Sequence, residues 1–249
     1  MKKLLLVCVM AVLGYGQLSA QDYERGIFNH LGANLSVGTE GIGIGVAAPC
    51  TDYLEFSFGI NFFPGIEIKD DVNLSIASLP AGYGIDPKVN IKGSMSRTML
   101  DFKVNAYPFG DKSSFFVAAG FSFGGKKIFD VTGHNDDIAD LPDAVRQMIS
   151  ADLDKYELKF DNNGDIKGDI RVKSFRPYLG LGFGRLVPKK RVGFRFELGC
   201  QFMGKLKVYQ NDNELAESLQ KSGDDDLSKW VDKVKVYPVM KFTLTGRIF

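Results

Sequence analysis

The chain has 249 residues, and its 31 basic side chains (lysine and arginine) nearly balance 30 aspartates and glutamates. A nucleic-acid-binding protein would normally carry a basic excess, so this balance argues against nucleic acid as a partner. A hydrophobic content of 45% excludes a disordered chain. No apolar run after residue 20 approaches the roughly 20 residues that a membrane-spanning helix needs.

The first twenty residues have the pattern of a secretory signal peptide. Lys2 and Lys3 form a basic start, an apolar run follows from Leu4 to Leu13, and Ala20 provides a small residue at the cleavage point. The alternative is a membrane anchor, for which about ten apolar residues are too few. We therefore expect a signal peptide over residues 1–20 and a mature domain over residues 21–249.

The mature chain contains eight segments in which large apolar residues alternate with glycine or polar residues. This period of two is typical of β-strands. The eight segments are His30–Val37, Gly41–Ala48, Tyr53–Phe62, Arg97–Tyr107, Phe115–Phe123, Phe175–Leu186, Val192–Phe202 and Val239–Ile248.

Two architectures fit this alternation. A soluble sandwich or ligand-binding barrel would bury the apolar face, whereas a membrane barrel turns the apolar face to lipid and the polar face to the lumen. The polar face is rich in glycine, serine, alanine and asparagine, which suits the narrow interior of an eight-stranded barrel. Three long connections, over residues 64–95, 124–174 and 203–238, alternate with short ones, as in barrels with short periplasmic turns and long extracellular loops.

The pattern therefore predicts an all-β fold: an eight-stranded antiparallel up-and-down transmembrane β-barrel with short helices in the extracellular loops. Aromatic residues near both ends of the segments would form two belts at the membrane interfaces.

Two stretches carry a family resemblance. The sequence Pro177–Gly184, followed by Gly193–Gly199, resembles a glycine and aromatic pattern of the small porin-like, eight-stranded outer-membrane barrels of Gram-negative bacteria. The resemblance implies a place in the cell outer membrane, in contact with its lipid. It also implies that the terminal Phe249 is read by the outer-membrane assembly machinery, although Thr245 and Arg247 depart from the hydrophobic residues common near that end. We expect a monomer.

The polar face offers a set of charged residues that would project into the lumen. One interpretation is an internal ion-pair network that fills a narrow barrel, because buried charges must be paired. The other is a basic constriction that selects small anionic solutes. The set contains six basic and three acidic residues: Glu55, Arg97, Asp101, Lys103, Arg176, Arg195, Glu197, Lys241 and Arg247.

The long connections contain two segments with helical spacing, Asp137–Tyr156 and Asp224–Val234. These helices would cap the mouth of the barrel, bind a partner, or place Trp230 at the lipid surface. The run from Asp161 to Asp165 has some features of a calcium loop but lacks the glycine and acid that such a loop requires at its sixth and twelfth positions. Asn163-Gly164 favours a hairpin turn instead.

Catalytic and metal sites receive little support. His30 and His134 are the only histidines, and neither has a cysteine or acid at metal-ligand spacing, so we expect no metal, no cofactor and no enzymatic activity. Cys50 and Cys200 should lie roughly 20 Å apart along the barrel, too far for a disulfide, so both should be free.

The resulting functional prediction is a porin-like or structural outer-membrane protein that could pass small solutes through a charged lumen. The alternative is a surface-exposed binding or adhesion protein that acts through its long extracellular loops. A third class, a soluble lipid-carrying barrel, would not require detergent for extraction.

Overall fold

The structure is a computed structural model and describes residues 25–76, 88–146, 149–153, 156–215 and 236–249. The predicted signal peptide and the predicted helix over Asp224–Val234 lie outside these residues. Within the described parts of the chain, no helix is long and apolar enough to cross a membrane.

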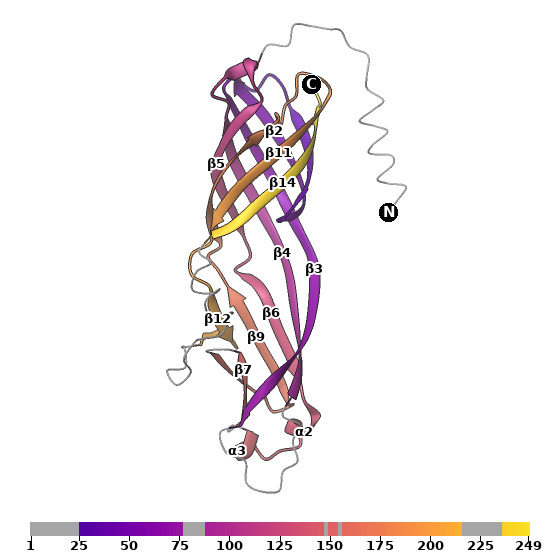
Figure 1. Cartoon of the computed structure of the whole chain (residues 1–249), viewed down its shortest axis with the longest axis vertical. Helices are drawn as coiled ribbons and strands as arrows, with labels where there is room; N and C mark the ends of the chain where they lie inside the picture. Colours follow the sequence, from indigo (N-terminus) through magenta and orange to yellow (C-terminus); the bar gives the residue numbers. More distant parts are fainter. Residues whose placement is uncertain (1–24, 77–87, 147–148, 154–155, 216–235) are drawn as a thin grey trace, which may run out of the picture.

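Eight antiparallel strands form a closed barrel (Figure 1). Each strand pairs with the next in the order given below, and the last pairs with the first through the register Leu35 to Leu244. Each of the eight predicted segments corresponds to one strand, so the predicted fold class is confirmed. The strands are β1 (Gly32–Gly38), β2 (Gly41–Thr51), β3 (Leu54–Ile76), β4 (Lys88–Ala106), β5 (Phe115–Gly124), β10 (Phe175–Phe183), β11 (Val192–Phe202) and β14 (Val236–Arg247).

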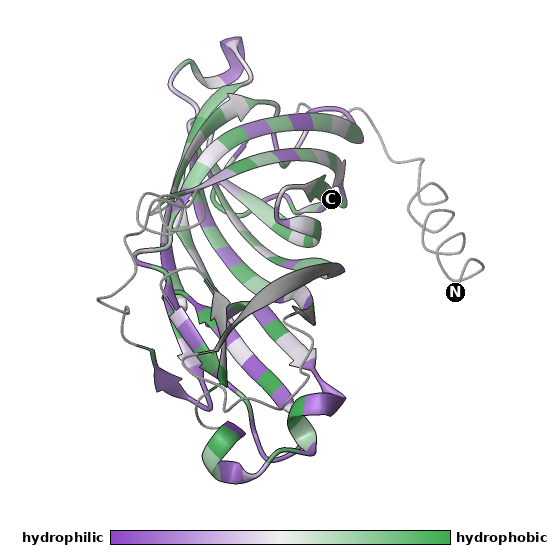
Figure 2. Cartoon of the chain, turned by 60° about the horizontal axis from the view of Figure 1, so that its bottom comes forward, coloured by the Kyte–Doolittle hydropathy of each residue, from purple (hydrophilic) through white to green (hydrophobic). Residues whose placement is uncertain are grey.

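The barrel carries its apolar side chains on the outside and its polar side chains on the inside. Leu35 and Phe242 are each 52% exposed, whereas Glu55 and Thr245 are fully buried. Figure 2 shows the resulting alternation of hydrophobic and hydrophilic residues along the strands. Because exposed apolar area costs roughly 25 cal/mol per Å² in water, this outer band is stable only in contact with lipid. The predicted inversion of the two faces is therefore confirmed.

Strands β3 and β4 continue well beyond the barrel. They contain 23 and 19 residues, whereas a tilted strand crosses a membrane with about 9–11. Their outer halves join six short strands in a sheet that we call the extracellular extension (lower half of Figure 1). These strands are β6 (Lys127–His134), β7 (Ile149–Leu153), β8 (Tyr156–Lys159), β9 (Asp165–Arg171), β12 (Lys207–Gln210) and β13 (Asn213–Glu214).

The extension has an apolar interior, the opposite of the barrel. Ile91, Val131, Leu158 and Ile166 pack together and are at most 6% exposed. This core is required because the outer face of the extension meets water rather than lipid. A second cluster near the far end joins Ile138, Leu141 and Ile149.

One glutamine links two strands that lie near opposite ends of the strand order. The Gln210 side chain accepts a hydrogen bond from the Lys159 backbone N–H at 3.0 Å and donates to the Lys159 carbonyl at 2.7 Å. Its amide thus takes the place of a peptide group in a strand. It joins β12 to β8, two strands that do not pair directly in the sheet.

Replacing Gln210 by leucine should open this link without unfolding the barrel. Two hydrogen bonds of about 1 kcal/mol each are lost, so the Lys159 amide should exchange its hydrogen on the order of tenfold faster. Hydrogen exchange followed by mass spectrometry measures this rate. Amides in β11 serve as the internal control, and equal exchange in both proteins at Lys159 would contradict the prediction.

The prediction of one helix over Asp137–Tyr156 is wrong. Two single-turn helices, α2 (Asp136–Ala139) and α3 (Asp143–Arg146), are followed by β7 and β8. Strand β7 pairs with the outer end of β3, in a part of the chain that the sequence pattern assigned to a loop. Long-range pairing therefore overrides the local helical spacing.

The predicted hairpin at Asn163-Gly164 is correct in its turn and wrong in its pairing. Gly164 has a φ of 72°, and the Asp161 carboxylate accepts hydrogen bonds from the backbone of Asn163 and Asp165. The flanking strands pair elsewhere: β8 with β7, and β9 with β6 and β12. The Asp161 oxygen that would have to bind a cation therefore already accepts hydrogen bonds from the backbone of its own loop.

The prediction that both mature cysteines are free is confirmed. Cys50 and Cys200 form no disulfide. Cys50 lies within β2, whereas the predicted strand ended at Ala48 and placed this cysteine in the following turn.

Candidate functional site: the charged lumen

The inward-facing charges come from alternate positions of five barrel strands, because successive side chains of a strand point to opposite faces. Eight of the nine predicted residues are at most 7% exposed. The ninth, Arg247, is the last residue of β14 and is half-buried. The eight are Glu55 on β3, Arg97, Asp101 and Lys103 on β4, Arg176 on β10, Arg195 and Glu197 on β11, and Lys241 on β14.

Glu197 is held by two cations and a hydroxyl group. Lys103 Nζ lies 2.9 Å from Oε1 of Glu197, and Arg195 Nη2 lies 2.7 Å from Oε2. The Tyr178 hydroxyl donates to Oε1, and the Lys103 ammonium lies 3.7 Å from the centre of the Tyr178 ring. We call these four residues the Glu197 cluster. Since an unpaired buried charge is costly, each member depends on the others.

A second carboxylate, Asp101, lies farther toward the extracellular side. Lys241 Nζ is 3.2 Å from its Oδ2. The Ser122 hydroxyl and the Asn61 amide each donate to the carboxylate at 2.6 Å. Lys103 Nζ, at 3.7 Å, connects this group to the Glu197 cluster.

Glu40 completes this group, and sequence reasoning missed it. It lies in the short turn between β1 and β2, yet it is 1% exposed and pairs with Lys241. The Gln201 amide also donates to it. Gly41, with a φ of 91°, permits the tight turn that folds Glu40 inward. The only available signal was an acidic residue in the shortest extracellular turn, and its presence brings the lumen closer to charge balance than the predicted six-to-three ratio.

Glu55 organises the periplasmic third of the lumen. The Tyr107 hydroxyl donates to its Oε2 at 2.6 Å, and Arg195 Nη1 donates to the Tyr107 oxygen at 3.2 Å. Arg185 Nη1 lies 3.6 Å from Glu55 Oε1. The backbone N–H of Leu186 donates to Oε2 at 3.2 Å.

The connection between β10 and β11 fills the periplasmic mouth. Leu186 and Val187 are at most 6% exposed and pack against Ala47. Arg185 donates to the carbonyls of Asp52 and Gly110 at 3.0 and 2.7 Å. The sequence pattern assigned residues 184–186 to the end of a strand, but β10 ends at Phe183. We call residues 185–187 the periplasmic plug.

Two arginines close the extracellular end of the lumen. The Arg97 guanidinium lies 4.4 Å from the centre of the Tyr237 ring. Arg176 donates to the carbonyls of Lys173 and Gly125 at 2.9 and 2.7 Å. Neither arginine forms an ion pair with a carboxylate among the residues that the structure describes.

The eight charges in the barrel are at most 7% exposed, so they are covered by one another and by their neighbours. A cavity of about 40 Å³ lies among polar and charged side chains that include Asn61, Asp101, Lys103 and Glu197. This volume accommodates roughly three water molecules. The lumen is therefore a packed polar core, and its chemistry is that of mutual charge neutralisation.

Outside the barrel, His134 connects the extension to helix α2. Its Nδ1 lies 2.7 Å from Asp165 and its Nε2 3.0 Å from Asp136. Sequence reasoning considered only metal-ligand spacing and missed both partners: Asp136 is two residues away, and the fold brings Asp165 close. Across the described ranges, no group of histidine, cysteine and acidic residues is suited to hold a metal ion.

The pairing of His134 should make α2 sensitive to pH. The hydrogen bond with Asp136, followed in size of effect by the one with Asp165, raises the pKa of His134 above its ordinary value. The pairing of protonated His134 stabilises the folded state. This stabilisation is complete below the unfolded-state pKa of about 6.5 and is lost as pH rises through the raised pKa of the folded state. An NMR titration should show that Asp136→Asn lowers the pKa of His134. The neighbouring Asp137→Asn is the control, and an unchanged pKa in Asp136→Asn would contradict the prediction.

Comparison with known proteins shows similarity in structure only. No family model and no curated protein matches the chain. The crystal structure of CarO2 from Acinetobacter baumannii has 22% identity and a TM-score of 0.50, and the match covers 88% of this chain and 98% of that one. CarO from the same species has 20% identity, coverages of 89% and 99% and a TM-score of 0.49. A major outer membrane protein from Thermus thermophilus has 16% identity, coverages of 88% and 99% and a TM-score of 0.35.

The likeness to CarO2 extends over nearly the whole length of both chains and shows a shared fold. The closed ring of eight antiparallel strands and its apolar outer band agree with that fold. The chain is therefore a small eight-stranded β-barrel of the outer-membrane type.

Proposed function

We propose that the barrel is a closed membrane anchor and that the extracellular extension carries the binding function of the protein at the cell surface. The observation that carries this proposal is the filled lumen. Of the two functions predicted from the sequence, it favours surface binding over solute passage. We assign no enzymatic activity.

Opening a path for solutes would require the loss of several buried interactions at once. The Glu197 cluster spans the interior from β4 to β11, and the Asp101 group continues to β14. Separating one buried ion pair costs several kcal/mol, because each charge is left without its partner. The periplasmic plug and the apolar core of the extension lie on either side of these ion pairs.

The extension supports the second half of the proposal because it is built as a folded platform. It has its own apolar core, and Arg146 fixes the segment around α2 and α3 by donating to the carbonyls of Ile138, Ala139 and Leu141. An ordered surface loses less conformational entropy on binding than a flexible loop does.

Planar-bilayer recording of the refolded protein tests the closed lumen. We expect no current steps in potassium chloride or in salts of small organic anions, whereas a larger porin in the same bilayer provides the positive control. Heat-modifiable migration on a detergent gel confirms that the recorded protein is folded. Stepwise conductance that falls on Arg195→Gln would overturn the proposal and support the porin interpretation.

Two further expectations belong to this proposal. Phe249 is 62% exposed beside the start of β1, where its carbonyl accepts a hydrogen bond from Leu31, so its ring is accessible for recognition during assembly. The closed ring leaves no barrel strand that needs a second chain for pairing, which supports a monomer.

A further inference from the structure

Three exposed lysines lie at the extracellular rim of the barrel, on neighbouring strands. Lys126 follows the end of β5, Lys173 precedes β10 and Lys205 follows the end of β11. Each lies two or three residues beyond an outward-facing phenylalanine that ends the apolar band. These phenylalanines are Phe123, Phe175 and Phe202, with exposures of 54%, 52% and 44%.

Backbone contacts bring the three segments side by side. The Val172 N–H donates to the Lys126 carbonyl at 2.9 Å, and the Lys173 N–H donates to the Met203 carbonyl at 3.4 Å. Gly204 lies against the Lys173 side chain, so that a Cβ atom on this glycine would be 3.2 Å from the lysine Cδ. The lysines thus form one continuous group, which we call the rim lysines.

No acidic side chain in the described part of the chain neutralises the rim lysines. Neighbouring lysines have acidic partners: Lys127 lies 3.2 Å from Asp169, and Lys207 lies 2.7 Å from Glu214. Lys126, Lys173 and Lys205 form no ion pair or side-chain hydrogen bond with any residue that the structure describes. As far as the described residues are concerned, their ammonium groups are open to an anion from outside the chain.

The opposite side of the rim lacks such a group among the described residues. There the turn between β1 and β2 contributes Thr39 and Glu40, and Glu40 is buried against Lys241. Over the described ranges, the unpaired positive charge of the rim is therefore concentrated over β5, β10 and β11, directly beyond the phenylalanines of those strands. An ammonium group at this level meets lipid headgroups, and its attraction to an anionic surface is about 1 kcal/mol.

We propose that the rim lysines bind the phosphate groups of anionic lipids in the outer leaflet. The phosphate of such a lipid lies at the level of the ammonium groups while its acyl chains contact the phenylalanines below. A free anion would gain only the charge contact, because the rim lysines are open to solvent and form no enclosed cage. The proposal rests on the membrane orientation of the barrel and not on the closed lumen.

A titration with dilauroyl phosphatidic acid tests the proposal. Refolded protein in a neutral detergent is examined by native mass spectrometry, and the fraction with bound lipid is compared with that for dilauroyl phosphatidylcholine. Because each lysine contributes about fivefold, Lys126→Gln/Lys173→Gln/Lys205→Gln should weaken phosphatidic acid binding about 100-fold. Binding of phosphatidylcholine should not change.

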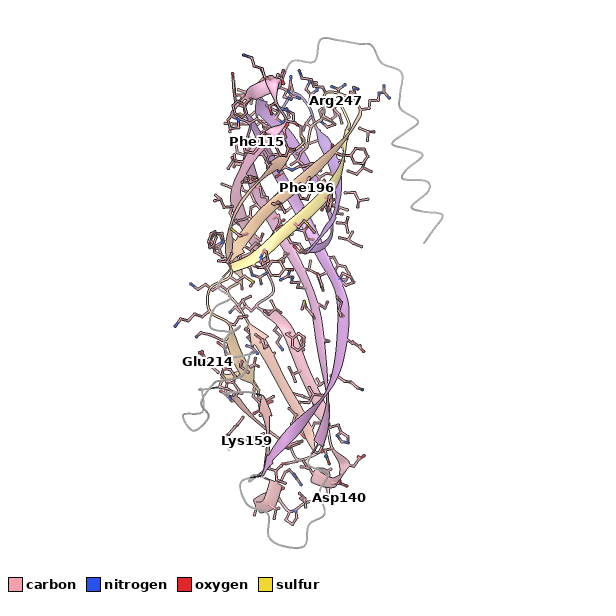
Figure 3. The ribbon with its side chains drawn as sticks, in the orientation of Figure 1. Phe115, Asp140, Lys159, Phe196, Glu214 and Arg247 are labelled. Atoms are coloured by element: carbon pink, nitrogen blue, oxygen red, sulfur yellow. The ribbon has the colours of Figure 1, made fainter. Side chains whose placement is uncertain are left out.

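The matched control removes three other exposed extracellular lysines, as Lys92→Gln/Lys159→Gln/Lys167→Gln, which lie on the extension away from the rim (Lys159 is labelled in Figure 3). We expect its phosphatidic acid affinity to stay within twofold of the original. Equal loss in both triple variants would overturn the proposal, as would wild-type affinity in the rim variant. Displacement of the lipid by an equal concentration of inorganic phosphate would also overturn it, because the site would then bind free phosphate. Heat-modifiable migration verifies that every variant is folded.

Discussion

Replacing Glu197 by glutamine should destabilise the barrel by about 3–5 kcal/mol, the cost of leaving buried charges without their partner. Glu197 is 3% exposed and is shared by Lys103 and Arg195. An amide keeps the shape of the side chain but removes its negative charge, so both cations lose their closest counter-charge. A urea titration of the folded, heat-modifiable gel band measures the free energy of unfolding.

Two further variants separate this effect from a general loss of packing. Glu67→Gln changes the same atoms on an exposed residue of β3, and we expect less than 0.5 kcal/mol, as is usual (about ±0.5) for surface substitutions. Lys103→Met in the Glu197→Gln background removes one of the two cations that have lost their counter-charge. It should recover part of the lost stability, because residues 103 and 197 are in contact. Additive effects of Lys103→Met and Glu197→Gln would show that the ion pair does not stabilise the barrel.

The strands of the barrel could be predicted because each one repeats a local rule. In β11, every second residue from Val192 to Phe202 is apolar, and the observed bounds equal the predicted ones. The lipid outside and the narrow lumen inside impose this alternation residue by residue, so a single sequence contains it. Eight of the nine predicted charges follow the same alternation and are buried.

The contacts that close the lumen could not be predicted, because they depend on where connections fold. Glu40 and the periplasmic plug both lie between strands, where no periodic pattern fixes the direction of a side chain. Phe116 was missed because it departs from the alternation. It is a large apolar residue on the inward face of β5, and the Arg195 guanidinium lies 3.4 Å from the centre of its ring. The pairing of β7 with β3 joins Leu74 to Ala151, far along the chain, and local spacing favoured a helix there.

Strand β4 shows how the surrounding solvent determines what faces inward. From Ile91 to Asn105 its odd-numbered residues point inward. Of these, Asp101 and Lys103 lie within the barrel, and Ile91 lies within the extension. Where the outside is lipid, the polar residues are inside; where the outside is water, the apolar residues are inside. The change from one arrangement to the other along a single strand locates the membrane boundary on the molecule.

An arginine on the outer face should therefore have different effects on the two sides of this boundary. Phe242 is 52% exposed on β14 and lies opposite Val37 and Phe196 in the middle of the apolar band. Phe242→Arg should reduce the stability of the barrel folded in lipid vesicles by about 2–4 kcal/mol, because the guanidinium must enter hydrocarbon. The folded fraction, read from heat-modifiable migration after refolding into vesicles over a urea series, measures this change.

Thr132→Arg is the matched control, because Thr132 is also an exposed, outward-facing strand residue but lies on β6 in the extension. It should change the folding free energy by less than about 0.5 kcal/mol, since its side chain stays in water. If the barrel were a soluble fold, Phe242→Arg would replace an exposed apolar group by a charged one and would be tolerated as well as Thr132→Arg. Equal tolerance of the two substitutions would thus contradict the membrane orientation, whereas loss of folding in Phe242→Arg alone follows only from an outer band in contact with lipid.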